Sequence, residues 1–447
     1  MADVTSKSNV FYRGPLRKAY PTMDRGEGIY LFDDEGNRYI DAKGGIAVVN
    51  VGYGVKEIVN AIAEQAEKLS YAFTIQFTTR AQEELAGKLA EFSPEGLDKV
   101  WFSLSGTEAN ETAIKIARQY HLETGNSTKY KVISTWNSYH GHTLGSLSLS
   151  GKVSWRKPYT PYLINFPHIF PANCYRCYYG QEYPGCDIFC AYELERVIKQ
   201  EDPDYVSAVI MEPIIAGTAG VVIPPPEYFT IIRSICDRHN VVMIVDEVFT
   251  GIGRTGRNFA IDHWNVIPDV IATAKGIAGG YMPLGATVIH RKIYDAIYEG
   301  SGQFVHGITF SGHPVACAAG VATLQYLEEH NLIERSARMG DYFLEKLSVL
   351  REIPMVGDIR GKGLLMGIEF VADRKTKAPF AREVDISRKV TSKAFEKGLI
   401  VQPGFGGIDG TLGDHILLAP PFIIQESEID KAVEILEVTC KEVETSL

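Results

Sequence analysis

Two polar residues of this chain stand at the ends of apolar segments that have the composition of β-strands. Asp246 closes the run Ile244-Val245-Asp246, and Lys275 follows the run Val270-Ile271-Ala272. Ligands of open α/β sheets bind outside the carboxyl ends of the strands. We therefore expect the carboxylate of Asp246 and the amine of Lys275 to converge on one small molecule.

A carboxylate and an amine at one sheet edge meet the two needs of pyridoxal phosphate. Its aldehyde binds a lysine as a Schiff base, and its pyridine nitrogen takes a carboxylate partner that keeps the ring an electron sink. The alternative is a surface lysine and an aspartate that caps a turn, which is the commoner role of either residue alone. The rest of the chain has to decide between these interpretations.

The composition indicates a large globular protein with a small-molecule partner. The chain has 447 residues, of which 45% are hydrophobic and 22% charged, and its formal net charge is −10. This length allows one large and one or two smaller domains, and without a long basic run neither a nucleic acid nor an anionic membrane is indicated. Met1–Arg13 lacks the apolar stretch of a signal peptide, so we expect a cytoplasmic protein.

Short apolar runs alternate with amphipathic helical stretches in the middle of the chain. Buried strands are expected at Val100–Leu104, Lys131–Ser134, Ala208–Met211, Val241–Val245 and Val270–Ala272, and helices at Ala109–Tyr120 and Glu227–His239. Strands that are apolar on both faces are typical of a parallel sheet covered by helices. The pattern predicts an α/β fold with a large, mostly parallel, doubly wound sheet.

The two ends of the chain are predicted to form a smaller unit. Near the C-terminus, strands are expected at Leu364–Phe370, Leu399–Val401 and Ile416–Leu418, with helices at Asp385–Lys397 and from Glu426 onward. Near the N-terminus, two strands flank Asp34-Glu35-Gly36, which predicts a β-hairpin. We expect an N-terminal segment (1–60) that belongs to the small domain, a large cofactor-binding α/β domain (61–330) and a C-terminal α+β domain (331–447).

A phosphate group needs backbone donors, and Ser105-Gly106-Thr107 offers them where a strand turns into a helix. Gly106 allows close approach, Thr107 adds a hydroxyl, and a helix N-terminus favours an anion. The alternative is a simple helix cap, because Ser or Thr followed by Glu is common there. A formal G-x-G-x-x-G string at Gly251–Gly256 lacks the strand-turn-helix context of a dinucleotide site, so we reject that function.

Three further residues are placed to face the same sheet edge. Tyr139 and His140 follow the strand-like Lys131–Ser134, and either ring could lie flat on a heteroaromatic ligand, although such rings more often serve in packing. Glu212 ends another apolar run, where a carboxylate could bind a ligand or cap the turn at Pro213. Their position favours a role in the site.

Four of the seven cysteines crowd into one loop-like segment. They are Cys174, Cys177, Cys186 and Cys190, in the spacing C-x2-C-x8-C-x3-C. A four-thiolate zinc site, redox-labile disulfides and a loop of reduced thiols are all compatible with this pattern. The spacing matches no common zinc module closely, and we therefore expect no metal in the functional site.

The ordered motifs resemble those of the class III pyridoxal-phosphate-dependent aminotransferases across nearly the whole chain. They are Ser105-Gly106-Thr107-Glu108-Ala109-Asn110, Tyr139-His140-Gly141, Glu212-Pro213, Asp246-Glu247-Val248, Gly251–Gly256, Lys275-Gly276 and Thr309-Phe310-Ser311-Gly312-His313-Pro314. The resemblance implies fold type I and a homodimer, or a tetramer, with active sites at the subunit interface.

The resemblance also implies a role for each matching residue. Lys275 would be the Schiff-base lysine and proton shuttle, and Asp246 would pair with the pyridine nitrogen. Val248 and Tyr139 would flank the ring. Ser105, Gly106 and Thr107 would hold the phosphate together with Thr309 of the partner subunit, with His140 and Glu212 as further cofactor-binding residues.

The substrate motifs depart from the ornithine, acetylornithine and 4-aminobutyrate branches. Leu417 replaces their arginine before Ala419-Pro420-Pro421, and His142 replaces the 4-aminobutyrate-type arginine. The chain resembles ω-aminotransferases that move an amino group from amines, β-alanine or taurine to pyruvate, although Gly410 replaces their mobile arginine and Ala47 a tryptophan. Racemases, aminomutases and decarboxylases on the same scaffold remain the alternative.

The partner of the acceptor's carboxylate is not identified by any motif. A bidentate arginine is the physically expected partner. Lys152, Arg156 and Arg176 are candidates because they lie in the irregular stretch between residues 140 and 190. A cation on a solvated face is the alternative for each of them.

Overall fold

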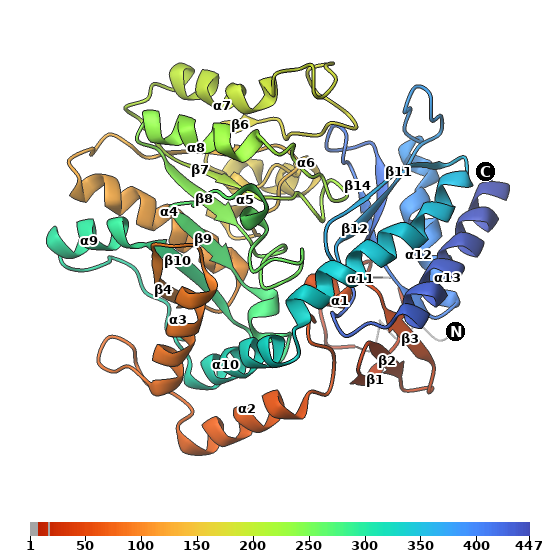
Figure 1. Cartoon of the computed structure of the whole chain (residues 1–447), viewed down its shortest axis with the longest axis horizontal. Helices are drawn as coiled ribbons and strands as arrows, with labels where there is room; N and C mark the ends of the chain where they lie inside the picture. The colour runs from red at the N-terminus through yellow and green to blue at the C-terminus, as the bar shows by residue number, and fades with distance from the viewer. Residues whose placement is uncertain (1–7, 17) are drawn as a thin grey trace.

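The largest sheet has seven strands in the order β4-β10-β9-β8-β7-β5-β6, in a computed structural model that describes residues 8–16 and 18–447 (Figure 1). The strands are β4 (Leu97–Ser103), β5 (Lys131–Thr135), β6 (His168–Ile169), β7 (Val206–Met211), β8 (Val242–Asp246), β9 (Val270–Thr273) and β10 (Gly285–His290). β10 runs antiparallel to both of its neighbours, β4 and β9, and all the other neighbouring pairs in this sheet are parallel. The predicted large, mostly parallel sheet is therefore confirmed.

Helices cover both faces of this sheet. They are α2 (Lys56–Lys68), α3 (Arg80–Phe92), α4 (Gly106–Glu123), α7 (Phe189–Gln200), α8 (Tyr228–Arg238), α9 (Arg291–Glu299) and α10 (Pro314–Glu329). Alternate residues of β8 enter two separate cores: Met243 and Val245 share one with α7, α8 and α10, and Val242 and Ile244 share the other with α4 and α9. This alternation explains why the strands read as continuous apolar runs.

Strand β10 was not predicted. Its sequence starts with Gly285 and places Thr287 between Ala286 and Val288, so its apolar run is shorter than those of the other central strands. The strand is buried because it lies between β4 and β9, which is a property of the assembled sheet.

The C-terminal part forms a second, smaller sheet. It has the order β11-β12-β15-β14 and consists of β11 (Val356–Gly361), β12 (Met366–Phe370), β14 (Gln402–Phe405) and β15 (Asp414–Leu418). The helices α11 (Leu332–Leu347), α12 (Ile386–Glu396) and α13 (Glu426–Thr445) belong to the same part of the chain. The expected α+β pattern is confirmed, but β11 and β14 were missed, and β14 contains Pro403 and Gly404, which are uncommon in strands.

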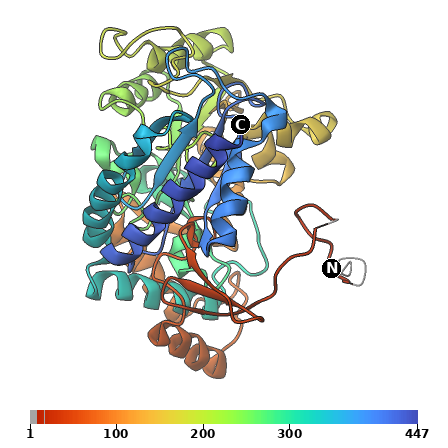
Figure 2. The ribbon, with the colours of Figure 1, turned by 90° about the vertical axis from the view of Figure 1, so that its right-hand side faces the viewer.

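The N-terminal strands lie beside the C-terminal part (Figure 1). β2 (Tyr30–Asp33) and β3 (Arg38–Asp41) form the predicted hairpin, β1 (Met23–Glu27) pairs with β2, and β3 pairs in parallel with β13 (Leu399–Ile400). The division at residues 60 and 330 stays a prediction, and its first seven residues lie outside the described part. Figure 2 shows that the segment before β1 leads away from the body of the protein.

Short helices complete the surroundings of the large sheet. They are α1 (Gly44–Ala47), α5 (Leu144–Leu149) and α6 (Val153–Arg156). None of the helices in the described part of the chain has the length and apolar character needed to span a bilayer.

Candidate functional site

A cavity of about 440 Å³ opens at the carboxyl ends of β4, β5, β8 and β9. Asp246 is the last residue of β8, Lys275 follows β9, and Tyr139 and His140 lie in the loop after β5. The predicted site residues that line it are Ser105, Gly106, Thr107, Tyr139, His140, Asp246, Val248 and Lys275. The sheet therefore brings together residues that are far apart in the sequence.

Three donors surround the buried carboxylate of Asp246. One oxygen, Oδ2, accepts hydrogen bonds from Asn110 Nδ2 and His140 Nδ1, each at 2.7 Å, and Oδ1 accepts one from the backbone N–H of Val248 at 3.0 Å. We place a proton on Nδ1 of His140 because a carboxylate can only accept. The network fixes both the direction of the carboxylate and the orientation of the imidazole.

The amine of Lys275 lies over the ring of Phe249, a buried residue that is not among those lining the cavity. Its Nζ is 3.8 Å from the centroid of the Phe249 ring. Burial lowers the pKa of Lys275 to about 8, and the nearby carboxylates of Asp246 and Glu212 oppose that shift. At neutral pH a usable fraction of this amine is therefore unprotonated and nucleophilic, which an ordinary lysine is not.

Glu212 sits directly behind this group of residues. It follows β7, is 6% exposed, and accepts a hydrogen bond from the backbone N–H of Tyr139 at 2.8 Å. Burial, together with the charge of Asp246, raises the pKa of Glu212 to about 8. Glu212 does not line the cavity, so its contact with the site runs through the Tyr139 loop and the charges of Lys275 and Asp246.

The N-terminus of α4 forms another wall of the cavity. A Cβ atom on Gly106 would lie 2.5 Å from Val248 Cγ1, and one on Gly141, whose φ is +136°, would lie 1.6 Å from Thr107 Oγ1. The hydroxyl of Ser105 accepts from the N–H of Glu108 at 3.3 Å, so Ser105 caps α4, and its role in binding a cofactor stays a prediction. The hydroxyl of Thr107 lies 2.7 Å from that of Ser146.

These groups fit pyridoxal phosphate. The first residues of an 18-residue helix face the cavity and suit an anion, and a buried carboxylate held by three donors suits a protonated ring nitrogen. The amine of Lys275, with its lowered pKa, suits an aldehyde. Tyr139 and Val248 supply an aromatic and an aliphatic side wall.

Several predicted residues lie elsewhere. Thr309 is exposed and does not line this cavity. Arg176 donates to Glu369 and to the carbonyl of Lys377, Arg156 lies 3.3 Å from His168 Nε2, and Lys152 donates to the carbonyl of Phe405. None of these three cations reaches the cavity, because each is bound by groups near the C-terminal sheet or the β6 strand.

The four clustered cysteines form no bond with one another in this structure. Cys174 is exposed and Cys177, Cys186 and Cys190 are partly buried. Across residues 8–16 and 18–447, no group of three or more His, Cys, Asp or Glu side chains is arranged to hold a metal ion.

Sequence reasoning gave no role to two residues of the site. Asn110 lies one helical turn after Gly106, on the same face of α4, and this spacing could have identified it. Phe249 follows Asp246-Glu247-Val248 and lies under Lys275, but no local pattern distinguishes it from an ordinary core phenylalanine.

Comparisons with known proteins agree with this geometry. The family model described as aminotransferase class-III matches residues 15–439. The omega-aminotransferase of Caulobacter vibrioides is 36% identical over 93% of either chain, and the adenosylmethionine-8-amino-7-oxononanoate aminotransferase of Geobacter sulfurreducens is 37% identical over 92% of this chain and 90% of its own length.

Solved structures show the same similarity. A thermostable (S)-enantioselective omega-transaminase from Thermomicrobium roseum superposes with a TM-score of 0.91 at 34% identity, covering 98% of this chain and 96% of its own. The similarity to transaminases of fold type I therefore extends over nearly the whole chain and is not limited to the site motifs. The chain belongs to the class III aminotransferases and is a pyridoxal-phosphate-dependent aminotransferase.

Proposed function

We propose that this aminotransferase moves an amino group from a primary amine or an ω-amino acid, such as β-alanine or taurine, to a keto acid such as pyruvate. The observation that carries this proposal is the environment of Leu417. Leu417 is 1% exposed. By the resemblance, the ornithine and 4-aminobutyrate branches have an arginine at this position. Leu417 therefore offers a donor's α-carboxylate no charged partner of the kind that an arginine supplies.

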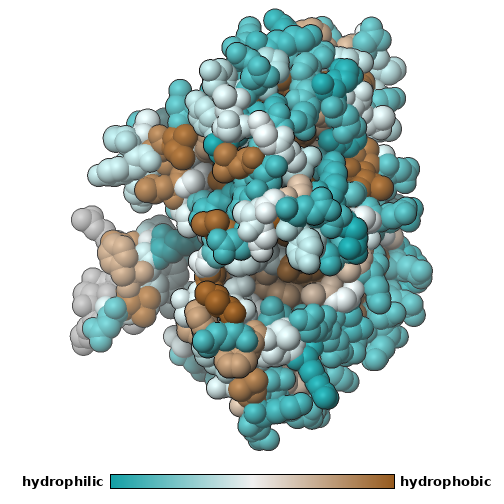
Figure 3. Space-filling view, turned by 90° about the vertical axis from the view of Figure 1, so that its left-hand side faces the viewer, coloured by the Kyte–Doolittle hydropathy of each residue, from teal (hydrophilic) through white to brown (hydrophobic). Residues whose placement is uncertain are grey.

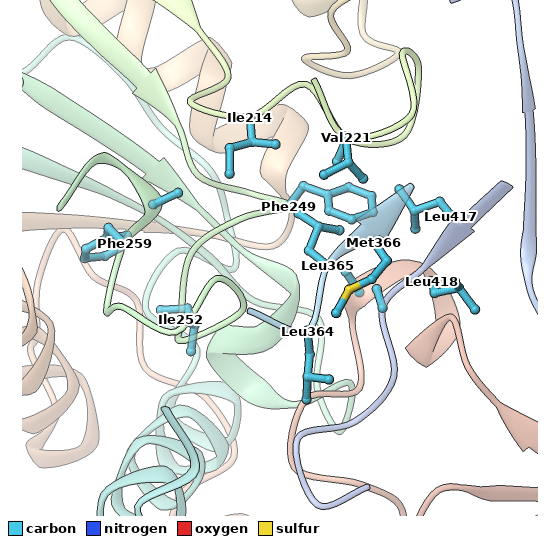
Figure 4. Close-up of a cluster of buried hydrophobic side chains, with 14 of the residues drawn as sticks. Ile214, Val221, Phe249, Ile252, Phe259, Leu364, Leu365, Met366, Leu417 and Leu418 are labelled. Atoms are coloured by element: carbon cyan, nitrogen blue, oxygen red, sulfur yellow. The ribbon is translucent and has the colours of Figure 1, made fainter. Parts of the chain in front are cut away.

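The side chains around Leu417 are apolar. Figure 4 shows Leu417 beside Phe249, Val221 and Met366, and all four are buried. Burying a carboxylate among such side chains without a partner is costly, because its hydration is lost and not replaced. A donor whose amine carbon has no carboxylate avoids that cost. Ala47, next to the cavity residue Val48, leaves more room than a tryptophan would.

Each residue of the site has a task in this proposal. Bound pyridoxal phosphate supplies an aldehyde for the amine and a ring that withdraws electrons. Gly106 and Thr107 would bind the phosphate, Tyr139 and Val248 would flank the ring, and Asp246 would hold the proton of the ring nitrogen. Lys275 Nζ would accept the proton from the amine-bearing carbon of the donor and then give it up again, which is general acid–base catalysis by one amine.

The activities for which the relatives are named support this donor class. Two of the reported proteins are an omega-aminotransferase and an (S)-enantioselective omega-transaminase, and all three are aminotransferases. The racemase, aminomutase and decarboxylase alternatives are therefore not favoured. Because adenosylmethionine is part of the name of the Geobacter relative, this compound should be among the amino donors that are tested.

A homodimer would complete the site. Tyr71, Phe73, Ile75 and Phe77 are exposed apolar side chains, and Tyr71 contacts the segment of Thr309 through a hydrogen bond to its carbonyl at 2.9 Å. Figure 3 shows apolar residues gathered in patches on one face of the protein. Exposed apolar patches of this kind mark association surfaces. In a dimer, Thr309 of the partner subunit would reach the phosphate.

Absorbance spectroscopy of the purified protein tests the proposal. The visible band of the bound cofactor is recorded with 1-phenylethylamine, β-alanine, taurine, adenosylmethionine or L-glutamate, and then with pyruvate. We expect the amine or the ω-amino acids to bleach the band and pyruvate to restore it. Bleaching by glutamate alone would contradict the donor class, and a band that no donor bleaches would return the racemase and decarboxylase alternatives.

A further inference from the structure

An aromatic face lies directly under the reactive amine of Lys275. Phe249 lies in the loop after β8, three residues beyond Asp246, and its ring centroid is 3.8 Å from Lys275 Nζ. An ammonium over a ring face is attracted by the negative charge density of the π-system, and this attraction grows when both groups are shielded from water. Phe249 is 9% exposed.

The ring is held in this position by its neighbours. Val221, Leu365, Met366 and Leu417 surround it in Figure 4, and the Cε2 atom of Phe249 is in van der Waals range of the position that a Cβ on Gly217 would occupy, at 3.6 Å. A packed ring cannot turn its face away without opening a void. The orientation of the ring towards Lys275 is therefore built into the contact between the large sheet and the C-terminal sheet.

No oxygen of a described carboxylate forms an ion pair with Lys275 within 4.0 Å, although Asp246 and Glu212 act on it from a greater distance. Arg254 adds an opposing positive charge. The Phe249 ring is thus the group in direct contact with Nζ that favours the ammonium form. A leucine of similar apolar character would fill the space without this interaction.

We propose that Phe249 is a positioning residue that stabilises the ammonium form of Lys275 and fixes the direction of its Nζ. The proposal rests on the proposed role of Lys275 as proton shuttle, and it gives Phe249 a function in addition to apolar packing. During turnover the free amine must accept a proton and hold it next to the reacting carbons. The ring favours that protonated state without offering a competing acceptor.

The test measures the amine itself in the protein without cofactor. Competitive labelling with 1-fluoro-2,4-dinitrobenzene across pH 5.5–10, followed by mass spectrometry of the Lys275 peptide, gives the pKa of this one lysine because only the neutral amine reacts. For Phe249→Leu we expect that pKa to fall by about half a unit to one unit, and labelling at pH 6.5 to rise about threefold to tenfold. Phe249→Tyr retains the ring face and should match the wild type.

Two controls separate the ring effect from packing. Phe343→Leu, at a fully buried position of α11, removes a ring far from the site and should leave the pKa of Lys275 unchanged. If Phe249→Leu does not fold, as judged by circular dichroism, 3,4,5-trifluorophenylalanine at position 249 keeps the shape while weakening the π-face, and the same fall is expected. An unchanged or higher pKa in either variant would overturn the proposal.

Failure of the proposed function is distinguishable from failure of this inference. The labelling experiment contains neither donor nor keto acid, so its outcome does not depend on which amine the enzyme uses. If the donor panel shows another substrate class but Phe249→Leu lowers the pKa of Lys275, the inference stands. If the panel gives the expected result but the pKa does not move, only the role of Phe249 is lost.

Discussion

His140 and Asp246 are joined by a hydrogen bond of 2.7 Å between Nδ1 and Oδ2, and both side chains are buried. Nε2 of the same imidazole has no partner within the described part of the chain. The ring therefore has one polar contact, and that contact orients the carboxylate we assign to the ring nitrogen of the cofactor. His140 lines the cavity, and it also acts on the cofactor site indirectly by orienting Asp246.

Removing the charge of Asp246 should reduce the rate more than it reduces cofactor binding. Asp246→Asn keeps the shape but cannot hold a proton on the ring nitrogen, and we expect a fall in kcat on the order of 100-fold or more.

His140→Leu should lower kcat about tenfold, because a charge-assisted hydrogen bond to Asp246 is lost, whereas His140→Asn can still donate such a bond. Steady-state kinetics check both, and equal rates for Leu and Asn at position 140 would contradict the role of the donor.

Lys275→Ala should abolish transamination. The matched control is Lys275→Arg, which retains the positive charge but cannot form the bond to the aldehyde, and it should be equally inactive. Burial lowers the pKa of the Lys275 amine to about 8, and only the neutral amine reacts with an aldehyde. When pyridoxal phosphate is added to cofactor-free wild-type protein, the rate at which the visible band appears should therefore rise as pH increases towards about 8 and level off above it. Turnover by Lys275→Ala near the wild-type rate would overturn the assignment.

The sequence identified this site through residues that break local patterns. Asp246 and Lys275 are polar residues at the ends of apolar runs, which only a strand-end site explains well, and their convergence follows from the parallel sheet. The partners of Arg176 could not be predicted in this way, because Glu369 and Lys377 are brought to it by the packing of the C-terminal sheet. Strand β10 and the position of Phe249 likewise depend on neighbours distant in the chain.

Glu212 should make the stability of the cofactor-free protein depend on pH. Its pKa is raised to about 8 in the folded state, so between about 4.5 and 8 the folded protein binds more protons than the unfolded one. The free energy of unfolding should therefore fall as pH rises through this window, and Glu212→Gln should reduce that fall. Urea unfolding at pH 6 and pH 8 measures how far the free energy of unfolding falls in the wild type and in Glu212→Gln. An equal fall in the two proteins would show that Glu212 is not protonated in the folded state.

Gly106 offers a test of how tightly the phosphate wall is packed. A Cβ at this position would lie 2.5 Å from Val248 Cγ1, so Gly106→Ala must displace either the start of α4 or the Val248 side chain. Since both line the cavity, we expect weaker binding of pyridoxal phosphate, by about tenfold or more if the shift costs about 1.4 kcal/mol. Titration of the cofactor-free protein, followed by absorbance, gives the Kd.

Two further variants show whether the loss of affinity arises from this one contact. Gly87→Ala in α3, where a Cβ would meet nothing within 4 Å, should leave the Kd unchanged and stabilise the helix by about 1 kcal/mol. Val248→Ala removes the opposing methyl groups, so Gly106→Ala should weaken binding less when it is added to Val248→Ala than when it is added to the wild type. If Gly106→Ala weakens binding equally in both backgrounds, the clash with Val248 is not the cause, and the free N–H groups of α4 would have to be perturbed directly.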